Sequence, residues 1–328
     1  MKKLISFILC IAFTLTLCSC GRGLKRFEKS FFDCFDTVSN VVVYDESEKA
    51  FEEKYALFHE KADYYSRLFD IYKYDDELVS LKYVNDHAAE APVKVEKEII
   101  ELLKYGKEVY DISGGTVNIC MGSVLKIWHE YREEGTRVPE TSLLEAANKH
   151  TDINALVINE TDCTVYFSDS DLSLDVGAIA KGYAAKELTE YAKSELWSSA
   201  LINLGGNVST YGMKPDGSKW NVQLENPDEN SSEPIKTLSV TDKAVVTSGN
   251  YQRYYEVDGK RYCHIIDPKT LMPADEFASV SVICDDSALA DALSTALFIM
   301  PLDEGRKLIN SLGNAEAVWV DKNYNIIE

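Results

Sequence analysis

The chain has 328 residues, of which 45% are hydrophobic and 11% aromatic, so it is long enough to bury a large core. It contains only 17 glycines and 8 prolines, which excludes a fibrous protein and a chain dominated by disorder. The formal net charge of -20 argues against nucleic acid as a partner, because binding along a phosphate polymer requires a basic face.

The N-terminal segment has the pattern of an export signal. Lys2 and Lys3 precede an apolar run over residues 4–17 that is short for a transmembrane helix. A small residue, Ser19, then stands directly before Cys20, which resembles the lipid-attachment site of a bacterial lipoprotein. We therefore expect a signal peptide over residues 1–19, lipid on Cys20, and a mature protein anchored at the extracytoplasmic face of the cell membrane. An ordinary secretory signal with incidental cysteines is the alternative.

The next residues, 20–30, are expected to form a short tether to a single domain over residues 31–328. In the first half of this domain, β-branched residues predict a strand at 38–44. Apolar residues at helical spacing predict helices over residues 46–69, 93–112 and 142–149. The second of these ends at a Ser-Gly-Gly stop, and residues 155–167 have the pattern of a hairpin.

The second half is rich in predicted strands. A helix is expected from Lys181 to about residue 196, and two more over residues 286–300 and 303–312. Strands are predicted at residues 200–204, 220–224, 236–240, 244–247, 254–257, 261–265 and 278–284, with a hairpin at 315–327. Helices and strands are partly segregated and many links are short, so we predict an α+β fold with antiparallel pairing.

Five cysteines follow the signal region, and they are scattered along the chain. No C-x-x-C spacing occurs among them, so the sequence indicates neither a zinc site nor a dense disulfide framework. One or two disulfides stay open as an alternative. The five are Cys34, Cys120, Cys163, Cys263 and Cys284.

A glycine-bearing turn at residues 174–186, LDVGAIAKGYAAK, could hold a phosphate. It is not a P-loop, because Lys181 precedes Gly182 instead of following it, and the dinucleotide fingerprint G-x-G-x-x-G is absent. What remains is a turn leading into a helix, whose first amide groups favour an anion. A simple strand-to-helix turn with a surface lysine is the alternative.

The apolar helix predicted over residues 286–300 carries an acidic residue in its interior, Asp291. A buried carboxylate must be neutralised, paired or bound to a cation. Thr295 lies four residues later and hence on the same face of the helix. A carboxylate and a hydroxyl one turn apart suit a hard cation such as Mg²⁺, which prefers oxygen ligands. Alternatively, Asp291 caps a neighbouring backbone segment.

Two further features are candidates for a site. His264 lies on a predicted strand that leads into an Asp-Pro turn, where its pKa near neutrality would suit a general base. A structural histidine is the alternative. The stretches 203–207 and 247–251 contain glycine and small polar residues, so either could let the backbone approach a ligand or merely reverse the chain.

Seven short segments, in this order, resemble those of the ApbE-type FAD:protein FMN transferases. Each is weakly specific alone, but together they span most of the mature chain. They are Phe-Asp-Thr at 35–37, Ser-Gly-Gly-Thr-Val-Asn at 113–118, Asp-Val-Gly-Ala-Ile-Ala-Lys-Gly-Tyr-Ala at 175–184, Asn-Leu-Gly-Gly-Asn at 203–207, Thr-Ser-Gly at 247–249, His-Ile-Ile-Asp-Pro at 264–268 and Ala-Asp-Ala-Leu-Ser-Thr-Ala at 290–296.

The resemblance implies a fold, a reaction and a set of site residues. The fold is the family's T-fold-like α+β core, with an antiparallel or mixed sheet and flanking helices. The reaction splits the pyrophosphate of FAD, attaches FMN through its phosphate to a threonine of an acceptor flavoprotein, and releases AMP. Mg²⁺ would be held by the side chains of Asp291 and Thr295 and the carbonyl of Ala178, with Ser294 near enough to assist.

The same resemblance implies which residues contact FAD. His264 is the candidate base that activates the acceptor threonine. The acceptor is expected to carry a Ser/Asp-Gly-Ala-Thr-like motif, which this chain lacks, so self-modification is not expected. The FAD contacts map onto Phe35, Tyr72, Thr116, Val117, Asn118, Asp175, Lys181 and Ile266.

This chain departs from the family pattern at three places. Val117 and Asn118 stand where Phe-Asp is usual, and Leu271 stands where glycine is expected. Residues 116–125 also lack a common proline. Two other functions remain open: an extracytoplasmic FAD pyrophosphatase that gives FMN and AMP, and a lipid-anchored FAD-binding protein without turnover.

Overall fold

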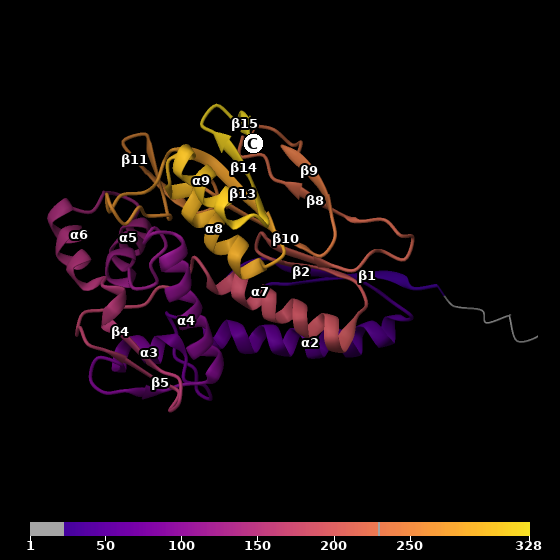
Figure 1. The fold of residues 1–328 in the computed structure, drawn as a ribbon, viewed down its shortest axis with the longest axis horizontal. Coiled ribbons are helices and arrows are strands. Elements are labelled where there is room, and N and C mark those ends of the chain that lie inside the picture. Colours follow the sequence, from indigo (N-terminus) through magenta and orange to yellow (C-terminus); the bar gives the residue numbers. More distant parts are fainter. Residues whose placement is uncertain (1–22, 229) are drawn as a thin grey trace, which may run out of the picture.

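The computed structural model describes residues 23–228 and 230–328 of the chain. Within these residues, eight strands form one antiparallel sheet, in the order β1-β2-β6-β7-β10-β13-β14-β15 (Figure 1). In chain order, the bounds are β1 Lys25–Phe31, β2 Ser39–Asp45, β6 Ala200–Leu204, β7 Asn207–Tyr211, β10 Lys243–Gly249, β13 Phe277–Cys284, β14 Ala315–Asp321 and β15 Ile326–Ile327.

Both faces of the central strands are covered. Successive side chains of a strand point to opposite faces of a sheet. Val246 and Val282 accordingly share a core cluster with residues of α8, whereas Val245 and Ile283 pack against β8 and β9. The covering elements are α8 Ser287–Ile299, β8 Trp220–Leu224 and β9 Lys236–Val240.

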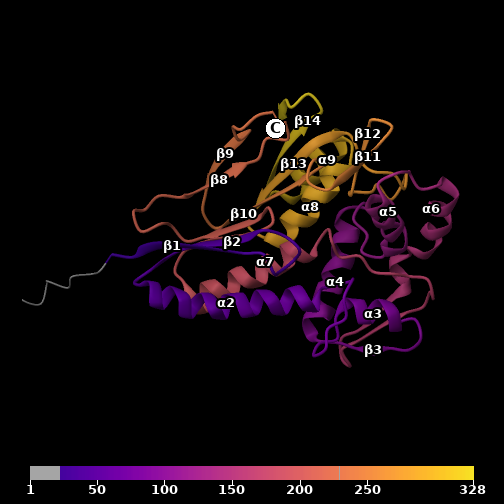
Figure 2. The ribbon, with the colours of Figure 1, turned by 180° about the vertical axis from the view of Figure 1, so that it is seen from behind.

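Two further helices, α7 and α2, extend the helical layer on the α8 side of the sheet. There α7 packs against α8, and the long helix α2 packs against α7 (Figure 1). A smaller lobe built from short helices and a three-stranded sheet lies at one end of the molecule (Figure 2). The bounds are α2 Glu48–Leu68, α3 Leu81–His87, β3 Val93–Lys94, α4 Lys97–Ile112, α5 Gly122–Glu134, α6 Thr141–Ala147, β4 Leu156–Asn159, β5 Thr164–Phe167 and α7 Ala180–Tyr191, which runs on as a π-helical turn at Ala192–Leu196.

A hairpin, a helix and two 3₁₀ turns complete the described chain. A separate hairpin of β11 Tyr254–Val257 and β12 Lys260–Cys263 leads directly to His264. The helix α9 Leu302–Leu312 connects α8 to β14. Short 3₁₀ turns at Asn148–His150 and Ile153–Ala155 connect α6 to β4.

The predicted α+β fold with antiparallel pairing is confirmed, but several elements differ from expectation. Residues 25–31, of which 25–30 were expected in the tether, form β1 and pair with β2 along their whole length. The helix expected from residue 93 begins at Lys97, because Val93–Lys94 pairs with β5 as β3. The helices α3 and α5 were not predicted. In α5 only Gly122, Val124 and Trp128 are buried, which is too sparse a pattern to mark a helix.

The expected signal peptide and the lipid attachment at Cys20 lie outside the described residues. Within the described part of the chain, no helix has both the length and the apolar character needed to cross a bilayer. The cysteines at 34, 120, 163, 263 and 284 are all free thiols in this structure.

Candidate active site

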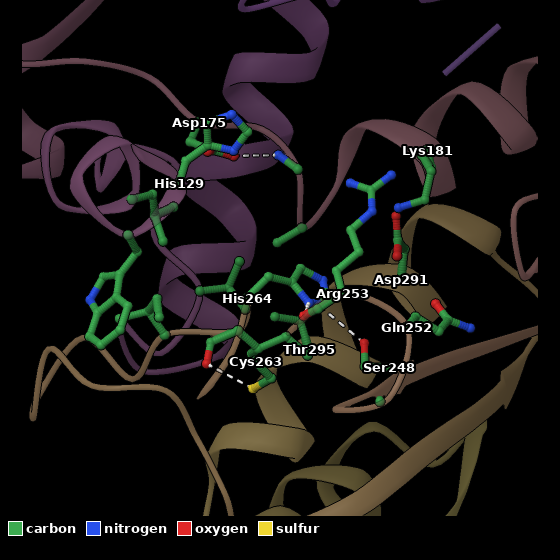
Figure 3. A pocket seen from close by; sticks show the side chains of 18 of the residues that line it. His129, Asp175, Lys181, Ser248, Gln252, Arg253, Cys263, His264, Asp291 and Thr295 are labelled. Carbon is green, nitrogen blue, oxygen red and sulfur yellow. Dashed lines mark hydrogen bonds between the residues drawn. The ribbon is translucent and has the colours of Figure 1, made fainter. Parts of the chain in front are cut away.

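A cavity of about 790 Å³ opens between the main sheet and the smaller lobe. Its walls come from α5, α7, α8, the turn after β10 and the segment after β12 (Figure 3). Most of the residues expected at the site line it, although they are far apart in sequence. These are Tyr72, Thr116, Val117, Asn118, Asp175, Ala178, Lys181, His264, Ile266, Asp291 and Thr295.

Two expected residues do not line the cavity. Phe35 packs against the main core, while its neighbours Asp36 and Thr37 reach the cavity wall. Ser294 is fully buried behind Thr295; its hydroxyl donates to the carbonyl oxygen of Asp291 at 2.9 Å and lies 2.8 Å from the Ser248 hydroxyl. Ser294 therefore supports the backbone of α8 from behind.

Asp291 sits where α7 and α8 touch. Only 5% of its surface is exposed, and its Oδ2 accepts hydrogen bonds from the Gly182 amide at 2.7 Å and from Asn207 Nδ2 at 3.4 Å. A Cβ atom at position 182 would lie 2.3 Å from the Asp291 Cβ. The glycine after Lys181 is thus required because the two helices approach so closely.

The surroundings of Asp291 leave its charge incompletely balanced. Burial raises the pKa of this carboxyl above its ordinary value of 3.8, whereas Lys181 and the two hydrogen bonds act in the opposite direction. Among the residues that the structure describes, no cationic side chain forms an ion pair with Asp291. Its carboxylate and the Thr295 hydroxyl both reach the cavity, which fits the oxygen donors that a hard divalent cation requires.

His264 faces the cavity with one ring nitrogen available. Its Nδ1 lies 3.2 Å from the carbonyl oxygen of Arg253, which assigns the proton to Nδ1 and leaves Nε2 as an acceptor. Burial, together with the positive charges of Lys181, Arg253 and Arg132, lowers the pKa of His264 to about 4. The imidazole is therefore neutral at physiological pH and can accept a proton through Nε2.

Asp175 and Asn118 occupy the opposite side of the cavity from α8. The Asp175 Oδ1 accepts from the Gly177 amide at 2.8 Å, and burial raises the pKa of Asp175 although nearby cations oppose the shift. Asn118 donates to the Thr151 carbonyl at 2.9 Å and accepts from the Cys120 amide. An aspartate could not make the first bond, so the amide at this atypical position stabilises the turn.

Leu271, which stands where glycine is usual, keeps a glycine-like backbone. Its φ is 60°, in the left-handed region, and its amide donates to the Asp267 carbonyl at 2.8 Å. Its own carbonyl accepts from Trp128 Nε1 at 2.9 Å, and its side chain is buried beside that indole. The turn is therefore retained, and burial of the leucine offsets a strain of about 1–2 kcal/mol.

Sequence reasoning missed two arginines and a histidine in the cavity wall. His129 and Arg132 come from α5 and are joined by a 2.7 Å contact between Arg132 Nη2 and His129 Nδ1. Arg253 follows β10, whose last residues are Thr-Ser-Gly, and it contacts the Asp36 carbonyl at 3.4 Å. Because α5 was not predicted, nothing in the sequence showed that Arg132 and Arg253 face one cavity. Together with Lys181 they make it suitable for an anionic ligand (Figure 3).

Comparison with known proteins gives a consistent assignment. The curated FAD:protein FMN transferase of Klebsiella pneumoniae is 33% identical over 80% of this chain and 83% of its own length. The one from Treponema pallidum is 33% identical over 74% of this chain and 70% of its own length. The crystal structure of the ApbE protein from Thermotoga maritima superposes with a TM-score of 0.82 at 29% identity, covering 93% of this chain and 97% of that one.

The model of the ApbE family matches residues 35–319, which include every element that lines the cavity. The order of the seven motifs, the fold and the relatives all agree with this match. The chain belongs to the ApbE family.

Proposed function

We propose that this chain binds FAD in the cavity, splits its pyrophosphate and transfers FMN to a threonine of an acceptor flavoprotein, releasing AMP in an Mg²⁺-dependent reaction. The relatives named FAD:protein FMN transferase support flavin transfer as the activity. The acceptor is expected to carry a Ser/Asp-Gly-Ala-Thr-like motif around that threonine.

One observation carries the proposal: the buried carboxylate of Asp291 and the hydroxyl of Thr295 open from one face of α8 into a cavity that also holds several cations. Its volume of about 790 Å³ lies within the range of ligand pockets and suits a dinucleotide. Asp291, Thr295 and the carbonyl of Ala178 would hold Mg²⁺. When bound, the ion neutralises phosphate charge and makes phosphorus more electrophilic.

The protein's own groups have separate tasks in this reaction. His264 accepts the proton of the acceptor threonine through Nε2, and the threonine oxygen forms a bond to the FMN phosphorus. The bond from that phosphorus to the bridging oxygen breaks, and AMP leaves with the electron pair. Lys181, Arg253 and Arg132 hold the phosphates, while Tyr72, Thr116 and Ile266 contribute wall surface to the flavin nucleotide.

The test is to incubate the protein with FAD, Mg²⁺ and a candidate acceptor domain. Transfer predicts equal amounts of AMP and of flavin that stays on the acceptor after denaturation, with mass spectrometry placing FMN on threonine. An acceptor whose threonine is changed to valine is the matched control and should stay unlabelled. AMP with only free FMN would instead establish a pyrophosphatase, and FAD binding without AMP under any divalent cation would establish a binding protein.

We also propose that Cys20 carries lipid and anchors the protein at the extracytoplasmic face of the membrane. Since β1 begins at Lys25, residues 21–24 alone separate the anchor from the fold. The start of β1 would therefore lie close to the membrane surface. Cys20→Ser should move the protein from the membrane fraction to the soluble one; continued sedimentation with membranes would contradict the anchor.

A further inference from the structure

A second group of ligand-type side chains lies outside the cavity wall, at the start of the loop that leads to it. We call Asp33, Cys34 and His59 the rim cluster. Asp33 and Cys34 follow β1, whereas His59 comes from the middle of α2, which runs alongside β1 (Figure 2). The potential ligand atoms of all three lie within 4.8 Å of one another.

The spacing within the rim cluster is close to that of a tetrahedral metal site. Asp33 Oδ1 is 3.0 Å from His59 Nε2 and 3.9 Å from Cys34 Sγ. With the usual zinc bond lengths and tetrahedral angles, two ligands on one zinc ion lie about 3.3 Å apart for an oxygen–nitrogen pair and about 3.6 Å apart for an oxygen–sulfur pair. One carboxylate oxygen thus faces both the thiol and the imidazole, so small shifts would suffice for a shared ion.

The three side chains are held by different parts of the fold. The His59 ring contacts Phe31 edge-on, with 5.3 Å between ring centroids, and it also lies against Tyr55. These contacts aim Nε2 at Asp33. Cys34 is fully buried. The Asp33 side chain is 66% exposed and leaves a route by which an ion could arrive from solvent.

The other mixed cluster in the described residues shows what a plain ion-pair arrangement looks like. His150 uses Nδ1 toward Asp169, at 3.0 Å, and Nε2 toward Asp171, at 3.9 Å. The ligand atoms of this cluster also lie within 4.8 Å of one another, but they are only nitrogen and oxygen, and each ring nitrogen of His150 already faces a carboxylate. The rim cluster differs because its ligand atoms include a sulfur.

We propose that Asp33, Cys34 and His59 bind a divalent cation of the zinc class, with water as the fourth ligand. A neutral imidazole, a thiolate and a carboxylate are the donors that such a borderline-soft ion accepts. The Cys34 thiol loses its proton to solvent as the sulfur–metal bond forms. The site is distinct from Asp291 and Thr295, whose oxygen donors suit a hard ion.

The site would act on the loop that borders the FAD cavity. Directly after Cys34, Phe35 and Asp36 both have left-handed backbones, with φ of 60° and 48°. Such non-glycine conformations are strained and persist only when neighbouring contacts enforce them. Asp36 and Thr37 line the cavity. An ion on Cys34 would fix the start of this loop and so position its cavity-lining residues.

Cobalt titration tests the site without relying on flavin transfer. The purified protein is treated with chelator, returned to excess Mg²⁺ and titrated with Co²⁺ under reducing conditions. We expect one equivalent to give a thiolate-to-cobalt charge-transfer band in the near ultraviolet, and Zn²⁺ to displace it. Cys34→Ser should abolish the band, and His59→Gln should weaken Co²⁺ binding by at least about 10-fold.

Cys163→Ser is the matched control, since Cys163 is also a free thiol but lies outside the cluster. Asp291→Asn is the second control, and both variants should keep the band. A band that is absent from the native protein, or that survives Cys34→Ser in folded protein, would overturn the proposal. Loss of the band in either control would do the same. Because the readout is a sulfur–cobalt band, its failure leaves the flavin transfer proposal intact.

Discussion

At the scale of single residues, the buried carboxylate of Asp291 makes the stability of the fold depend on pH. Its folded-state pKa is raised by burial, so the folded protein binds the proton more tightly than the unfolded chain does. The stability that this proton contributes is present at low pH and is lost as pH rises above 3.8 through the raised pKa. The carboxylate is thus a stability cost at neutral pH unless a cation occupies the site.

Asp291→Asn separates these two effects. An amide keeps an oxygen for the Gly182 N–H but carries no charge. We expect Mg²⁺-dependent transfer to fall by about 100-fold or more, because the metal loses its charged ligand. In EDTA, the melting temperature of the variant should rise relative to the native protein between about pH 4 and about pH 7. If the melting temperature of the native protein instead rose relative to that of the variant over this pH range, the raised pKa of Asp291 would be contradicted.

His264 makes a second prediction at this scale. Because burial and, after it, the surrounding cations lower the pKa of His264 to about 4, the imidazole stays neutral at pH values well below its ordinary pKa of 6.5. At saturating Mg²⁺, which competes with protons for Asp291, the rate of AMP release should stay level from about pH 7 to about pH 5 and fall near pH 4. A fall in the rate of AMP release centred near pH 6.5, which His264→Gln does not show, would mean that the pKa of His264 is not lowered in this way.

At the scale of elements, the contact between α7 and α8 brings the glycine-bearing turn at residues 174–186 next to Asp291. Gly182→Ala would place a Cβ 2.3 Å from the Asp291 Cβ and 2.6 Å from the Ser287 carbonyl oxygen. We expect the variant to lose about 1–3 kcal/mol of stability in urea unfolding, although alanine favours helix. Flavin transfer should fall as well, because Asp291 moves.

The matched control for this prediction is Gly305→Ala in α9. There the added Cβ meets the end of the flexible Leu297 side chain at 3.0 Å and the Trp319 indole at 3.4 Å, an ordinary van der Waals distance. Relaxation of that side chain should leave stability unchanged or raised by up to about 1 kcal/mol. Equal losses in both variants would mean that helical glycines, and not the α7–α8 contact, explain the effect.

Elements also show where sequence reasoning succeeded and where it failed. The helix α8 was predicted because an apolar run with one acid is a strong local pattern. The turn at Leu271 keeps its left-handed backbone through burial against Trp128, which a local pattern does not reveal. β1 was missed because only Phe27 and Phe31 mark its inward face. In each failure, partners distant in sequence decide the structure.

At the scale of the whole molecule, the site depends on two halves of the fold meeting. The order of the motifs predicted that Asp175, Lys181 and Asp291 surround one ligand. In the structure all three line one cavity. Arg132 and Arg253 could not be predicted, because isolated arginines on α5 and a loop look like ordinary surface residues in sequence. The rim cluster was missed for the same reason: His59 lies on a helix far from Cys34 in sequence.

This architecture predicts that FAD links the two halves even without metal. His129 and Arg132 contribute to the cavity from the smaller lobe, and Thr295 contributes from the helix that covers the main sheet. FAD at 100 times its Kd should stabilise the protein by about 2.7 kcal/mol, which corresponds to a rise in melting temperature of roughly 5 °C. Hydrogen exchange should slow in both α5 and α8, since opening either lobe releases the ligand. Arg253→Gln should reduce the rise, whereas Asp291→Asn should retain it in EDTA. Protection confined to α8 would place FAD away from the smaller lobe and contradict this arrangement.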